Sequence, residues 1–167
     1  MRLFIASPVE LYRYENIQEA FDSSIKGKWV KRHNTHLTWI FLGDTLSPNR
    51  AQACLREASV LLREPVTLRG LGTFGKPPHI LYARSDASVL YKQAEALASV
   101  GFESARFKPH VTLCRIKTLY DKAAFVAQRK RFETTVIGTV IPRITLYRST
   151  LTPQGPRYTP LFTIQAP

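Results

Sequence analysis

The hydrophobic pattern of the first 25 residues predicts a strand followed by a helix. Residues 1–6 form a nearly continuous apolar run that is typical of a buried strand. Ser7-Pro8-Val9-Glu10 follows, with an N-cap residue, a proline suited to the first helical turn and a capping-box glutamate. Because apolar residues then recur at helical spacing, we predict a helix from this point, with an inner stripe made of Leu11, Tyr14, Ile17, Phe21 and Ile25.

The rest of the chain divides into short elements separated by Gly, Pro and Asp. The predicted elements are, in order, a strand at 36–42, a helix at 47–62 opened by Ser47-Pro48, strands at 66–71 and 80–84 joined by a Gly- and Pro-rich loop at 72–78, a helix capped by Asp86 that ends before Gly101, a strand at 110–116, a helix at 120–131, and strands at 144–151 and 158–164. This mixture of strands and helices favours an α+β fold.

Two of the predicted strands open with the same motif, His36-Leu37-Thr38-Trp39 and His110-Val111-Thr112-Leu113. Successive side chains of a strand point to opposite faces, so His and Thr share one face while the apolar residues fill the other. A third match, His33-Asn34-Thr35, lies in a polar, basic stretch without strand alternation. The two strands predict a cleft that holds two imidazoles and two hydroxyls; the alternative is a pair of unrelated core histidines.

The spacing of the two motifs indicates a weak internal duplication. His36 and His110 lie 74 residues apart, and a helix follows each motif strand. We therefore expect two pseudo-symmetric lobes of antiparallel sheet, with helices packed outside and the active-site cleft between them. No linker rich in Pro, Gly and Ser separates the lobes, so residues 1–167 are expected to form one domain.

The charge of the chain favours a polyanionic partner. The formal net charge is +12, and no acidic residue follows Glu133. Phosphate contacts with release of counterions are the usual consequence of such an excess, although a basic protein with its charge spread over solvated faces is the alternative. Basic residues gather beside both motifs, which favours RNA or nucleotides as partners: Lys26, Lys28, Lys31 and Arg32, and then Arg106, Lys108, Arg115 and Lys117.

Paired histidines provide acid–base chemistry without a metal. Near neutral pH one imidazole can accept a proton while the other donates one. His-x-Thr is not a metal-ligand spacing, Asp44 is the only carboxylate near a motif, and the two cysteines are isolated, so we expect neither metal nor cofactor.

Cys54 and Cys114 suit reduced thiols, with a disulfide as the open alternative. Reduced thiols favour a cytoplasmic setting, and we expect a monomer. We expect no membrane association, because no apolar run approaches the roughly 20 residues of a span.

The ordered set of these segments resembles the 2H phosphoesterase superfamily, and within it the RNA 2′,3′-cyclic phosphodiesterases once catalogued as 2′-5′ RNA ligases (the LigT group). The resemblance covers nearly the whole chain. Trp39 departs from it, since a smaller aliphatic residue is expected there, and Tyr82 and Arg84 depart from its usual Trp and Gly. The resemblance rests on Arg2-Leu3-Phe4-Ile5-Ala6, Trp29-Val30, the segment from His36 to Gly43, Gly72-Thr73-Phe74, the segment from Phe107 to Arg115, Ser149-Thr150-Leu151 and Gly155-Pro156-Arg157-Tyr158.

This resemblance implies hydrolysis of a 2′,3′-cyclic phosphate, on an RNA end or a nucleotide, to a 2′-phosphate. We assign His110 as the base towards water and His36 as the acid towards the leaving oxygen, although the reverse leaves the other expectations intact. Thr38 and Thr112 would donate hydrogen bonds to the phosphate oxygens, ordinary β-propensity being the alternative for a lone Thr.

Three further residues are expected to bind substrate. Arg115 would clamp the phosphate, but simple alternation puts it on the face opposite His110, so a bulge is required; otherwise it is a surface residue. Tyr158 and Phe74 would line the cleft and stack on a base, or else serve in the core or anchor a loop. Two other functions remain open: 2′-5′ RNA ligation by the same site in reverse, and non-catalytic RNA binding.

Overall fold

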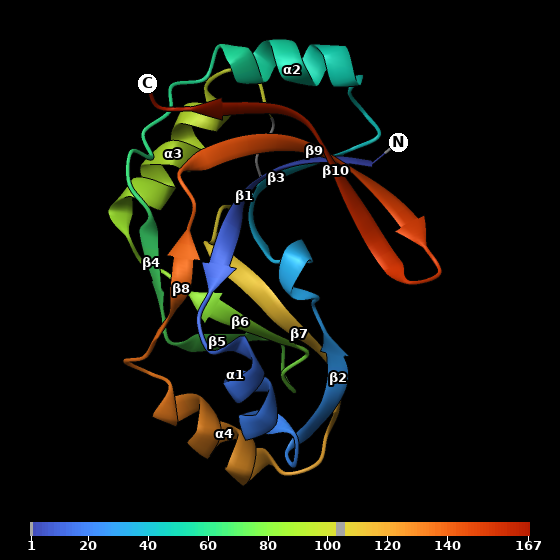
Figure 1. Ribbon diagram of the computed structural model, residues 1–167, viewed down its shortest axis with the longest axis vertical. Helices are drawn as coiled ribbons and strands as arrows, with labels where there is room; N and C mark the ends of the chain where they lie inside the picture. Colours follow the sequence, from blue (N-terminus) through green and yellow to red (C-terminus); the bar gives the residue numbers. More distant parts are fainter. Residues whose placement is uncertain (1, 103–105) are drawn as a thin grey trace.

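The structure is a computed structural model that describes residues 2–102 and 106–167. Its described part holds four α-helices and two antiparallel sheets (Figure 1), which confirms the expected α+β class. A cleft lies between the two sheets, as expected. The strands are β1 (Arg2–Leu11), β2 (Ile25–Trp29), β3 (His36–Gly43), β4 (Val66–Arg69), β5 (Leu71–Phe74), β6 (Ile80–Arg84), β7 (His110–Leu119), β8 (Val136–Val140), β9 (Arg143–Thr152) and β10 (Gly155–Gln165). The helices are α1 (Tyr14–Phe21), α2 (Pro48–Arg56), α3 (Ser88–Ala98) and α4 (Lys122–Arg131).

The long strand β1 organises the first sheet. Its first part pairs with β3 on one side and with β9 on the other, and β10 lies outside β9. Its last residues, Val9 to Leu11, pair instead with β8, which pairs in turn with β4. The first motif strand, β3, is therefore held against the centre of this sheet.

The second sheet has the order β2-β7-β6-β5 and holds the other motif strand. β7 lies between β2 and β6, so its backbone is hydrogen-bonded on both sides. Helices α1 and α4 lie together at this end of the molecule, while α2 and α3 lie at the other end (Figure 1). The motif strands face each other from the two sheets, with helices on the outside as expected.

The start of the first helix differs from the sequence-based prediction. Residues 7–10 continue β1, and α1 begins only at Tyr14, after Arg13 in a left-handed conformation (φ 55°). Ser7 is fully buried; its hydroxyl donates to the carbonyl of Arg143 at 2.6 Å and accepts the indole N–H of Trp39 at 2.9 Å. Pairing of β1 with distant strands therefore overrides a local capping signal. A short sequence window carries no information about which distant strands will pair with it.

Other boundaries also shift for identifiable reasons. Helix α2 begins after its Ser47 cap as predicted but ends at Arg56, and the segment after it is held by Gln93, whose amide oxygen accepts the N–H of Leu61 at 2.6 Å. Ala87, not Asp86, is the N-cap of α3. Residues 72–74, expected in a loop, belong to β5, and strands β2 and β8 were not anticipated. Both missed strands are only 5 residues long, which is too short for a clear periodic signal.

Candidate active site

Both motif strands carry a bulge at the same place. In the β1–β3 pairing, Ala6 lies opposite Thr38 and Ile5 opposite Ile40, so Trp39 is the extra residue. In the β6–β7 pairing, Tyr82 lies opposite Thr112 and Leu81 opposite Cys114, which makes Leu113 the extra residue. Two consecutive buried residues follow each Thr, and the alternation is then reversed.

The reversed alternation brings one further side chain of each strand onto the cleft face. Arg115 lies five residues after His110 and is exposed beside it in the cleft, through the bulge that its expected role requires. Phe41 lies five residues after His36 and is 77% exposed in the same cleft. Phe41 was not among the site residues predicted from the sequence. The equal five-residue offset in the two motifs could have revealed it.

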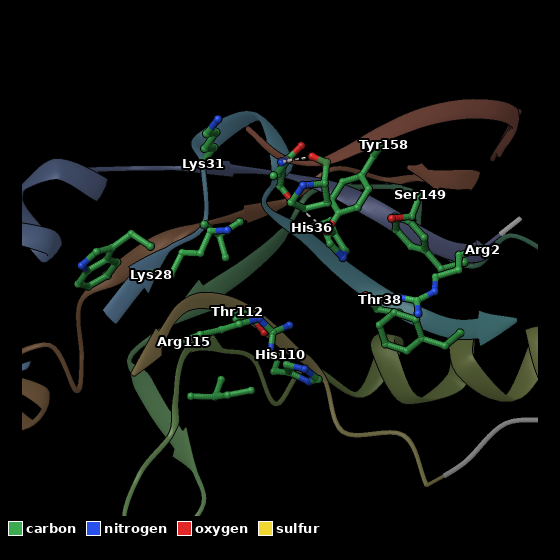
Figure 2. Close-up of a pocket in the computed structure, with 18 of the residues that line it drawn as sticks. Arg2, Lys28, Lys31, His36, Thr38, His110, Thr112, Arg115, Ser149 and Tyr158 are labelled. Atoms are coloured by element: carbon green, nitrogen blue, oxygen red, sulfur yellow. Dashed lines mark hydrogen bonds between the residues drawn. The ribbon is translucent and has the colours of Figure 1, made fainter. Parts of the chain in front are cut away.

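A cavity of about 680 Å³ lies between the two sheets. Figure 2 shows His36, Thr38 and Tyr158 on one side of it and His110, Thr112 and Arg115 on the other. Six of the seven expected site residues therefore meet around one space. Phe74 is not among the lining residues; its ring packs edge-on against the His110 imidazole, with centroids 5.0 Å apart. The cavity is also lined by residues that were not predicted as part of the site, among them Arg2, Phe4, Asn34, Ile80, Ser149 and Gln154.

The two imidazoles are held in the same way. Nδ1 of His36 lies 2.7 Å from the carbonyl oxygen of Asn34, and Nδ1 of His110 lies 2.8 Å from that of Lys108. A carbonyl can only accept, so in each ring Nδ1 carries the proton of this hydrogen bond. This assignment leaves Nε2 of each ring as the nitrogen that can accept or donate a proton in the cleft.

Aromatic rings fix the orientation of both histidines. His36 packs against Phe4, with ring centroids 5.1 Å apart, and edge-on against Tyr158 at 5.2 Å. His110 packs in the same manner against Phe74 and, at 5.7 Å, against Tyr82. Such packing restricts ring rotation, which is what preorganised acid–base groups require.

Burial influences the protonation of the first half of the site. It lowers the pKa of His36, and the neighbouring His110 acts in the same direction, while the hydrogen bond to the Asn34 carbonyl opposes the change. Burial also raises the pKa of Tyr158 above its ordinary value, against the influence of Arg115. Tyr158 is therefore a neutral hydroxyl at neutral pH, able to donate a hydrogen bond into the cleft.

The cleft is cationic. Arg2, Lys28, Lys31 and Arg115 line it together with the two histidines, and no Asp or Glu is found among its described lining residues. Within residues 2–102 and 106–167, no group of three or more His, Cys, Asp or Glu side chains is arranged to hold a metal ion. No helix in this described part is both long and apolar enough to cross a membrane. A cationic cleft with two histidines suits an anion that undergoes proton transfer.

Comparison with known proteins identifies the family. Residues 7–82 match the family described as LigT like Phosphoesterase. The chain is 32% identical over 161 residues to the RNA 2′,3′-cyclic phosphodiesterase of Aquifex aeolicus, covering 87% of this chain and 85% of that protein. It is 34% identical over 151 residues to the protein of the same name from Aeropyrum pernix, covering 83% and 86%.

Solved structures share the fold over nearly the full length. The crystal structure of TT0787 of Thermus thermophilus superposes with a TM-score of 0.70 at 27% identity, covering 99% of this chain and 97% of that one. The crystal structure of E. coli LigT complexed with 3′-AMP has the same fold, with a TM-score of 0.68 at 23% identity, covering 98% and 97%. On its sequence and its fold, the chain belongs to the LigT-like phosphoesterases of the 2H superfamily.

Proposed function

We propose that this protein hydrolyses 2′,3′-cyclic phosphate ends of RNA to 2′-phosphates by metal-independent catalysis with two histidines. One observation carries the proposal: His36 and His110, each held through Nδ1, lie on opposite walls of a single cationic cleft. The relatives of this chain bear the name of this activity, and the LigT structure with 3′-AMP contains a nucleotide. These facts favour a nucleotide phosphate as the reacting group.

The histidines would act as a base and an acid. Nε2 of His110 takes a proton from water as the water oxygen forms a bond to phosphorus. The bond from phosphorus to the ribose 3′ oxygen breaks, and Nε2–H of His36 gives its proton to that oxygen. The products are a 2′-phosphate and a free 3′-hydroxyl, and the proton taken from water restores His36 through solvent exchange. Each transfer of this kind accelerates a reaction by about 10²–10⁴-fold.

The remaining side chains would stabilise the phosphate. Thr38 and Thr112 share the cleft face with the histidines and can donate their hydroxyl protons to the non-bridging oxygens. Arg115 adds a planar set of donors on the wall that carries His110. Negative charge on these oxygens grows as water attacks, so fixed donors favour the transition state over the bound substrate.

A single assay tests this function. The protein is incubated with 2′,3′-cyclic nucleotides in EDTA, and the product is identified by chromatography against 2′- and 3′-phosphate standards. We expect the 2′-phosphate alone. A requirement for a divalent metal would contradict the mechanism, and an inert protein would favour the non-catalytic RNA-binding function. Joining of a cyclic phosphate end to a 5′-hydroxyl in preference to hydrolysis would identify a 2′-5′ ligase.

The pH dependence of hydrolysis should reflect the burial of His36. A general acid must carry its proton, and burial lowers the pKa of His36 from 6.5, so kcat/KM is expected to decline with rising pH from a point below 6.5. In the enzyme–substrate complex the phosphate anion stabilises the imidazolium, so the corresponding limb of kcat should lie at higher pH. Profiles of both quantities test this. If His36 governs the acid limb instead of the alkaline limb, it is the base.

A further inference from the structure

Two like charges lie opposite each other on the cleft side of the second sheet. In the β2–β7 pairing, Lys28 is the direct partner of Arg115, and both side chains are exposed and line the cavity. Directly paired residues of antiparallel strands have Cβ atoms roughly 5 Å apart on the same face, and like charges there are destabilising. An anion bound beside the pair would relieve this repulsion.

Lys31 extends the charge towards the rim of the cavity. Its Nζ donates to the carbonyl of Gln154 at 2.9 Å, and the side-chain amide of Asn34 donates to the carbonyl of Pro156 at 3.0 Å. These two bonds tie the turn between β9 and β10 to the segment that carries Lys31. Since an ammonium has three donors, Lys31 retains two for a ligand. Figure 2 places Lys28 and Lys31 on one side of the histidines, and Arg2 and Ser149 on the other.

Among the described residues, no carboxylate neutralises this side of the cavity. Over the residues that the structure describes, ion pairs join Arg32 to Glu15 and Arg84 to Glu133, and neither pair includes a cavity cation. Unneutralised lysines beside a phosphate clamp are what a polyanionic chain recognises, because release of its counterions favours binding. A lysine is a flexible point charge and contacts phosphates without reading bases.

We propose that Lys28 and Lys31 form a second phosphate subsite, which binds the internucleotide phosphates next to the cyclic end, so that oligoribonucleotide ends are preferred over mononucleotides. The inference rests on the proposed function, because Arg115 marks the position of the reacting phosphate. The RNA backbone would run from Arg115 past Lys28, its partner on the neighbouring strand, and then to Lys31.

Binding of uncleavable products provides the primary test. The ligands are a trinucleotide ending in a 2′-phosphate and adenosine 2′-monophosphate, titrated at several salt concentrations. The protein is expected to bind the trinucleotide about tenfold more tightly, as additional charge-assisted contacts imply. In Lys28→Gln and in Lys31→Gln this preference should fall about threefold each, and the logarithmic salt slope for the trinucleotide should become shallower by about 0.7.

Matched variants separate the subsite from general charge effects. Lys28→Arg should retain the preference, and Lys92→Gln, on the exposed side of α3, should change neither affinity. Equal affinity for the two ligands, or an equal loss for both in Lys28→Gln, would overturn the inference. Hydrolysis of both cyclic substrates without a binding preference overturns only the inference, whereas a preference without any hydrolysis overturns only the proposed function.

Discussion

Replacing His36 or His110 by alanine is expected to reduce kcat/KM for a 2′,3′-cyclic nucleotide by about 10²–10⁴-fold. Each imidazole has a fixed Nδ1 bond and an Nε2 that can transfer a proton in the cleft, so neither can substitute for the other. Each ring also packs against two aromatic side chains, and a control for folding is therefore needed. Unchanged circular dichroism and an unchanged denaturation midpoint would assign the loss to chemistry.

An activated ester distinguishes the acid from the base. Nitrophenolate leaves without being protonated, so bis(p-nitrophenyl) phosphate does not need a general acid. His36→Ala should therefore retain a much larger fraction of wild-type activity on this ester than on the cyclic nucleotide, whereas His110→Ala should be poor on both. The opposite result would exchange the two roles. Variants that hydrolyse the cyclic nucleotide at the wild-type rate would remove both histidines from the mechanism.

Replacement of Arg115 by alanine is expected to lower kcat/KM by about 10²–10³-fold, the usual cost of removing a donor to developing charge. The bulge at Leu113 turns the exposed side chain of Arg115 into the cleft that holds both histidines. Arg115→Lys should recover part of the loss, since it keeps the charge but not the planar pair of donors. Steady-state kinetics should show the loss mainly in kcat, because the interaction strengthens in the transition state.

A remote arginine provides the control for that variant. Arg129 lies in the last turn of α4, at the end of the molecule opposite α2 and α3 (Figure 1), and is not among the residues that line the cavity. Arg129→Ala removes the same charge from the whole molecule and should leave hydrolysis unchanged at moderate salt. If Arg129→Ala and Arg115→Ala lose activity equally, the effect is one of net charge and not of a phosphate clamp.

The sequence located the motif strands well because their signals are local. Apolar alternation around His36 and His110, with breakers at the ends, depends only on neighbouring residues. The same reasoning failed at Ser7, where a capping signal lies inside a strand whose partners are more than 25 residues away or near the other end of the chain. Pairing over such distances leaves no local trace, so the extension of β1 and the existence of β8 could not be predicted.

The bulges explain why the site was predicted only in part. Arg115 required an irregular strand, and the family resemblance supplied the reason to expect one. Phe41 reaches the cleft through the same irregularity in the first motif. Regular alternation along a strand would instead put it on the face opposite His36. Lys28 was noted only as one of several basic residues near the first motif. Its position opposite Arg115 depends on the register of β2 with β7, which the sequence does not encode in any short window.

The internal duplication of the sequence does not correspond to two separable units in space. β1 and β3 come from the first half of the chain, yet the sheet that contains them is completed by β8, β9 and β10 from the second half. The other sheet takes β2 from the first half and seats it against β7. Neither half of the chain therefore contains a whole sheet. A fragment with the first motif keeps the β1–β3 pair but lacks β8, β9 and β10, and a fragment with the second motif lacks β2, the partner of β7. The two halves of the chain therefore depend on each other for folding, because each sheet is completed only by strands from both of them.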